Sequence, residues 1–165
     1  MKKITVLVVT LLMMAMTAQA QEIEKLINRY SNDERFHYVS LSADLIRFGL
    51  SFIDDKSNEI DEVIKNELSK IKGLKVLTLE SESESAEEKK LIESITNELN
   101  SILQKTSRAE PIIETREKGD ITKIYATSEG LLLMRKEPGE LSIVFISGEL
   151  SKKAIKEIIS QTDKK

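Results

Sequence analysis

The segment from Glu110 to Gly148 constrains the fold most, because short β-type runs alternate there with turn signals. Gly119-Asp120 and Pro138-Gly139 are both suited to two-residue hairpin connections. Ser128-Glu129-Gly130 separates the two hairpins. The pattern predicts a four-strand antiparallel meander, with strands over Ile112 to Glu117, Ile121 to Thr127, Leu131 to Lys136 and Leu141 to Ser147.

Upstream of the meander, apolar residues recur at steps of three and four, which is the spacing of a helix face. Ser85 and Glu88 fit a capping box. Gly73 suits the left-handed position that follows a helix. The predicted helices are Glu22 to Tyr30, Ala43 to Ile53, Ser57 to Ile71, Ser85 to Lys105 and a last one from Ser151; the predicted strands are Phe36 to Leu41 and Leu74 to Leu79.

These elements predict one α+β domain over residues 21–165. Its sheet is largely antiparallel, with five or six strands, and ends in the four-strand meander. We expect Leu74 to Leu79 to join the sheet of the meander. About five helices then pack against that sheet.

The first 20 residues have the pattern of a cleavable secretory signal peptide. Lys2 and Lys3 precede an apolar run that ends at Met16, and Ala18-Gln19-Ala20 has the small-x-small spacing of a cleavage site. The run is short for a membrane span of about 20 apolar residues, although an uncleaved anchor is the alternative. We therefore expect cleavage after Ala20, export to the periplasm of a Gram-negative cell, and no membrane span afterwards.

Composition excludes several classes of function. The 165 residues include no cysteine, which removes thiol catalysis and zinc–thiolate sites. Charges of both signs are interspersed at a formal net charge of −3, so we expect no nucleic-acid partner. Glycine is scarce and forms no phosphate-binding motif, so we expect no nucleotide or other cofactor.

No residue has the context of a catalytic or metal-binding group. His37, the single histidine, lies on the strand face of Val39 and opposite Ser40, so a structural role is the better interpretation. The run Glu80 to Ser85 lacks the Asp, Asn and Gly of a calcium loop. Asp54-Asp55 is best interpreted as a pair at a helix junction. We predict no catalytic residue and no metal ligand.

Alternation along the meander sorts its side chains into two faces. One face is apolar throughout and is expected to meet the helices; it comprises Ile113, Ile124, Ala126, Leu131, Leu133, Val144 and Ile146. The other mixes charged with large apolar groups, as interfaces do. Its candidate interaction residues are Lys123, Tyr125, Leu132, Met134, Ile143 and Phe145. They are expected to bind a protein partner or a second copy, unless the N-terminal helices cover them.

Three segments carry a resemblance to a known family: Val39 to Ser42, Ile71 to Leu77 and Ile146 to Leu150. With them, the chain resembles a Bacteroidetes family of exported proteins classed as a domain of unknown function, number 4252 of that series. The resemblance implies the envelope of a Gram-negative cell and brings no known activity, cofactor or catalytic residue. Its genes often lie near sigma-factor genes, which implies envelope-stress regulation. Some relatives carry a lipobox cysteine that this chain lacks, so lipid anchoring is not inherited.

The sequence thus predicts a non-catalytic binding or interaction module. The alternative is a small periplasmic hydrolase whose site is assembled from scattered residues. A deep pocket that collects His37 and two carboxylates would favour that alternative.

Overall fold

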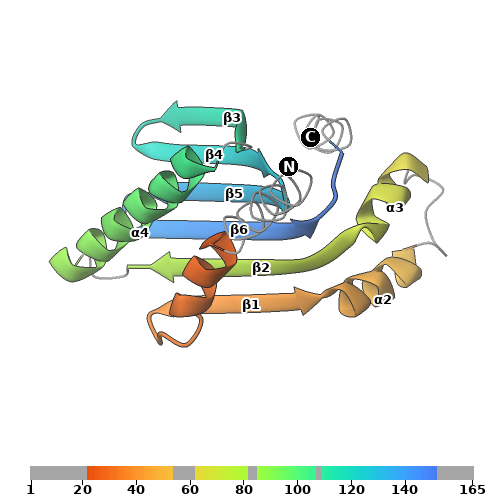
Figure 1. Cartoon of the computed structure of the whole chain (residues 1–165). Helices are drawn as coiled ribbons and strands as arrows, with labels where there is room; N and C mark the ends of the chain where they lie inside the picture. Colours follow the sequence, from red (N-terminus) through yellow and green to blue (C-terminus); the bar gives the residue numbers. More distant parts are fainter. Residues whose placement is uncertain (1–21, 54–61, 82–84, 107–108, 152–165) are drawn as a thin grey trace, which may run out of the picture.

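The computed structural model describes residues 22–53, 62–81, 85–106 and 109–151. Its strands are β1 (Phe36–Ser42), β2 (Ile71–Glu80), β3 (Glu110–Glu117), β4 (Asp120–Thr127), β5 (Gly130–Glu137) and β6 (Glu140–Gly148). They form one six-stranded sheet in the order β1-β2-β6-β5-β4-β3, with every neighbouring pair antiparallel (Figure 1). The predicted α+β class is therefore confirmed.

Four helices accompany the sheet in the described residues. They are a helix over residues 22–30, α2 (Ala43–Ile53), α3 (Glu62–Ser69) and α4 (Ala86–Lys105). The helix of residues 22–30 and α4 lie on the same side of the sheet, whereas α2 and α3 extend beyond the ends of β1 and β2 (Figure 1). The further helix expected from Ser151 onward falls outside the described residues.

The C-terminal strands form the predicted meander. In the second hairpin Glu137 faces Glu140 and Leu133 faces Val144, as expected, and Gly139 takes the positive φ of 82° that a type II turn needs. In the first hairpin Glu117 faces Asp120, so the loop is Lys118-Gly119 and not Gly119-Asp120. Both loop residues have positive φ, as the tight turn requires. The register differs from the predicted one by two residues, so each side chain stays on the expected face.

The start of β2 corrects the prediction for the helix before it. The helix expected over Ser57 to Ile71 is described as α3 from Glu62 and ends at Ser69, and residues 57–61 lie outside the described ranges. Gly73 is not a helix cap, because it pairs with Ser42 on one side and with Ser147 on the other. Pairing with two neighbouring strands extends β2 back to Ile71, and this gain outweighs the local helical signal.

The capping box of α4 forms as predicted. The Ser85 side chain accepts a hydrogen bond from the Glu88 backbone N–H, at 3.2 Å. At the other end, the Thr106 hydroxyl donates to the Ile102 carbonyl at 2.8 Å. Between these caps one stripe of the helix is buried: Ile92, Ile95, Leu99, Ile102 and Leu103. The long helix therefore presents a continuous apolar side to the sheet.

The core lies between this stripe, the helix of residues 22–30 and one face of the sheet, which we call the covered face. Ile23, Leu26 and Ile27 are at most 2% exposed and supply the side of the N-terminal helix. The sheet supplies Phe36, Leu77, Leu79, Leu132, Met134, Leu141, Ile143 and Phe145. Ion pairs at the margin hold the helices in place, with Arg29 2.9 Å from Glu98 and Lys75 3.2 Å from Glu24.

The covered face is not the one that the sequence favoured. The uniformly apolar face was expected to meet the helices, yet the helices pack on the mixed face that carries Phe145 and Tyr125. The alternative, that N-terminal helices cover the mixed face, is confirmed. The reason is that the charged residues of this face lie at its margins. Lys75 is matched there by Glu24 and Asn28 of the N-terminal helix, so burial of the centre leaves this charge paired.

Candidate functional site

The six predicted interaction residues separate into two groups. Leu132, Met134, Ile143 and Phe145 are at most 1% exposed and pack under the helices, so they are core residues in this fold and cannot reach a partner. Lys123 and Tyr125 lie nearer the β3 edge of the same face, beyond the apolar stripe of α4. They line a recess between that helix and the sheet.

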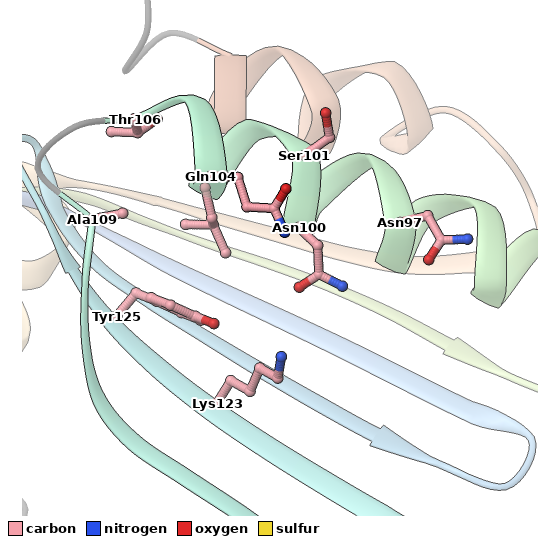
Figure 2. A pocket seen from close by; sticks show the side chains of 9 residues that line it. Asn97, Asn100, Ser101, Gln104, Thr106, Ala109, Lys123 and Tyr125 are labelled. Carbon is pink, nitrogen blue, oxygen red and sulfur yellow. The ribbon is translucent and has the colours of Figure 1, made fainter.

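The recess has a volume of about 640 Å³ and a polar lining. Because α4 turns its apolar stripe toward the sheet centre, its next side faces the outer strands, and that side is rich in amides. Figure 2 shows Asn100 pointing from α4 toward Lys123 on β4, whereas the Ser101 hydroxyl points away from the strands. The complete lining is Asn97, Asn100, Ser101, Leu103, Gln104, Thr106, Ala109, Lys123 and Tyr125.

Lys123 is the cation of the recess and is already engaged. Its Nζ lies 3.7 Å from Glu114 Oε1, and its side chain is 14% exposed. The same Glu114 oxygen accepts a 2.8 Å hydrogen bond from Arg116. That hydrogen bond, with the nearby Lys123 charge, holds the pKa of the Glu114 carboxyl below its usual value. The recess can donate and accept hydrogen bonds, but no carboxylate or histidine lines it.

The other face of the sheet, which we call the open face, is apolar and only partly exposed. Its apolar residues from all six strands are Val39, Leu41, Leu74, Val76, Ile113, Ile124, Ala126, Leu131, Leu133, Val144 and Ile146. None of them belongs to the buried cluster formed by the described residues. Exposure ranges from 9% at Ile124 to 49% at Val39. A continuous apolar surface of this kind is typical of an interaction site.

Acidic side chains border one end of the open face. Glu140 faces Glu80 on one neighbouring strand and Glu137 on the other, and Glu117 faces Asp120 in the first hairpin. Arg135 lies on the same face and pairs with Glu137. The five carboxylates, one on each of β2 to β6, outnumber this arginine and give the end of the face a negative charge. We call this row of carboxylates the acidic border.

The chain leaves the sheet beside a buried carboxylate. Glu67 on α3 is 7% exposed, and its two oxygens accept hydrogen bonds from Lys70 Nζ at 2.7 Å and from the Ser151 backbone N–H at 2.9 Å. These hydrogen bonds, that from Lys70 above all, hold the pKa of Glu67 below its usual value. The contact fixes the end of β6 against α3 and is structural.

The other candidates from the sequence do not assemble into a site. His37 is exposed on β1 and faces Thr78 of β2, away from the recess. Within the described ranges, no group of three His, Cys, Asp or Glu residues is arranged to hold a metal ion. No helix in those ranges is long and apolar enough to span a bilayer. Asp54-Asp55 and residues 82–84 of the run from Glu80 to Ser85 lie outside the described residues.

Comparisons with known proteins identify a family and no activity. No curated protein and no solved structure gave a match. A family model described as a domain of unknown function matches residues 30–158, from the end of the first helix through the whole sheet and past Ser151. The match therefore includes both faces of the sheet and part of the segment that follows β6. The chain belongs to the family of the domain of unknown function DUF4252.

Proposed function

We propose that the protein is a non-catalytic binding module of the periplasm that holds a partner protein on the open face of its sheet. The observation that supports it is the apolar surface from Val39 to Ile113, which crosses all six strands outside the buried cluster. A surface of this composition in water favours removal of its apolar area by a partner. Export rests on the signal peptide predicted over residues 1–20, and a role in envelope-stress regulation rests on the resemblance to the family.

The acidic border indicates the chemistry of the partner. Glu80, Glu137 and Glu140 lie side by side at the end of the apolar surface. A partner that buries apolar side chains there must bring basic groups to that end, because carboxylates left unpaired at an interface are costly. The partner segment is thus amphipathic, with an apolar side flanked by Lys or Arg. An amphipathic helix laid across a sheet face meets this description.

Nothing in the described residues favours the hydrolase alternative. The hydrolase alternative needs a deep pocket that collects His37 and two carboxylates. The recess beside α4 is lined by neither His37 nor a carboxylate.

A synthetic helical peptide of leucine and lysine serves as the probe, with a leucine and glutamate peptide of the same pattern as its control. We expect the basic peptide to bind at least tenfold more tightly than the acidic one, about 1.4 kcal/mol. Binding should weaken with added salt, because charge at the rim is screened. Fluorescence anisotropy of labelled peptide measures both effects.

Variants locate the binding site. Leu133→Thr with Val144→Thr removes apolar surface at the centre of the open face while retaining strand-forming residues, and should lower peptide affinity about tenfold. Asn97→Ser with Asn100→Ser, in the recess, is the matched control and should leave affinity unchanged. A loss of affinity in the recess variant, with unchanged affinity in the open-face variant, would overturn the proposal and assign binding to the recess. The helix predicted from Ser151 onward has Ile155 and Ile159 on its apolar side. Tighter peptide binding after Ile155→Glu with Ile159→Glu would also overturn the proposal, because this C-terminal segment would then be the occupant of the open face.

A further inference from the structure

The two edge strands of the sheet differ in how well they resist pairing with another strand. β3 carries the usual protections: a proline at position 111, a bulge between Pro111 and Ile113, and four charged side chains. Each of these interferes with an incoming strand, since proline and the bulge disrupt the hydrogen-bond ladder and the charges oppose desolvation. The β3 edge is therefore closed to pairing.

β1 has none of these protections. Its sequence, FHYVSLS, contains no proline and no Asp, Glu, Lys or Arg, and all seven residues pair with β2 in unbroken register. Among the described residues, the backbone hydrogen bond that β1 makes outside that ladder runs from the Phe36 N–H to the Asp33 carbonyl. The outer edge of β1 is thus a regular row of backbone donors and acceptors. Such an edge is a template for another strand.

Exposed large apolar side chains gather at the same edge. In the described residues these are Val39, Leu45 and Phe48, which are 49%, 52% and 61% exposed. All three lie on β1 and on α2, the helix that directly follows it. Backbone pairing capacity and apolar side chains therefore occur together at the β1 edge, and this combination supports a protein interface.

We propose that β1 pairs with β1 of a second copy of this chain, antiparallel and centred on Val39, so that two sheets become one continuous sheet. The strand is complementary to itself in this register. Val39 meets Val39, Tyr38 meets Ser40, and His37 meets Leu41, with no pair of like charges. A two-fold axis at Val39 gives a closed dimer in which each surface is used once. α2 of each copy then lies beside the start of the other β1, where Leu45 and Phe48 find apolar neighbours.

The cysteine-free sequence permits a direct test of this register. Facing residues of an antiparallel pair have Cα atoms about 4.5–5.5 Å apart, within the range of a disulfide. Val39→Cys in the mature chain should therefore form a disulfide-linked dimer under mild oxidation. Thr115→Cys, an exposed position on β3, should form no disulfide-linked dimer under the same conditions. Equal cross-linking of the two variants, or none in either, would overturn the proposal.

The oligomeric state gives an independent test. Light scattering after size exclusion should find a dimer of the mature chain in the micromolar range. Val39→Lys, which adds a charge to the edge, should yield a monomer with unchanged circular dichroism, whereas Thr115→Lys should remain a dimer. Because Val39→Lys could disturb folding, Leu45→Glu with Phe48→Glu on α2 provides a second variant and should weaken the dimer at least tenfold. A wild-type monomer throughout the range, or a dimer that persists in both β1–α2 variants, would contradict the inference.

Discussion

The two faces of the sheet have a similar number of apolar side chains and different surroundings. On the covered face, Phe145, Leu132 and Ile143 are at most 1% exposed, beneath two helices. On the open face, their sequence neighbours Val144 and Leu133 are only partly buried. A sheet that is apolar on both sides is ordinarily covered on both. The difference indicates that the protein reserves one apolar face for contacts beyond its described core.

The kind of apolar residue also differs between the faces. The covered face has the large flexible or aromatic groups, such as Phe36, Met134 and Phe145, which fill the irregular space under a helix. The open face is mostly β-branched, as at Val76, Val144 and Ile146. β-branched residues stabilise strands by themselves, because they fit a pleated surface without a covering layer. The sheet can therefore hold its form where the described helices cover only one of its faces.

The largest expected effect comes from truncation on the covered face. Phe145→Ala should lower the free energy of unfolding by about 3–5 kcal/mol, because it leaves a cavity beneath both helices. Val144→Ala, one residue away on the open face, should cost about 1 kcal/mol. Urea denaturation of both variants measures the contrast. Equal losses would mean that the open face is packed as tightly as the covered one.

The helices should show the same contrast. Leu99 on α4 is fully buried, so Leu99→Ala should cost about 2–5 kcal/mol. Leu45 on α2 is 52% exposed, and Leu45→Ala should stay within about 0.5 kcal/mol in the monomeric state. Thermal and urea unfolding at low protein concentration give both values. A loss above about 2 kcal/mol at Leu45 would show that α2 belongs to the core.

A smaller, pH-dependent effect belongs to the turn that leads into β1. Hydrogen bonds from the Arg35 side chain and backbone lower the pKa of Asp33 to about 2. In the unfolded chain the pKa is about 3.9, so the stabilisation is full above that pH and is lost as the pH falls toward 2. Asp33→Asn should remove this part of the acid sensitivity. Urea unfolding at a series of pH values measures the free energy of unfolding of both proteins. If this free energy falls equally with pH in the variant and in the wild type, Asp33 does not have this role.

The regular parts of this fold could be predicted from local sequence. Turn residues such as Gly139 set the hairpin register, and Ser85 with Glu88 set the start of α4, because both depend on contacts within a few residues. The start of β2 could not be predicted in the same way. Gly73 resembles a helix cap until its pairing with Ser42 and Ser147 is known, and those residues are distant in sequence.

The choice of covered face was left open by the sequence. Composition favoured the uniformly apolar face, since Lys123 and Tyr125 made the other look like a surface. The position of each residue on the mixed face decides which face the helices cover. Lys123 is at the margin, paired with Glu114, while Phe145 lies at the centre. The recess beside α4 was missed because it needs the polar side of that helix and β4 together. The amides Asn97, Asn100 and Gln104, at helical spacing on α4, were the available signal.

The most direct test of an uncovered apolar face is the accessibility of single cysteines at neighbouring positions. Since the chain has none of its own, Val144→Cys and Ile143→Cys each introduce one thiol, on opposite faces of β6. In the native protein, a small maleimide should modify the cysteine at position 144 within about tenfold of the rate in the unfolded chain. The cysteine at position 143 should react only as the protein opens, several orders of magnitude more slowly. Equal protection of the two thiols would contradict the account, because the chain itself would then cover both faces of its sheet.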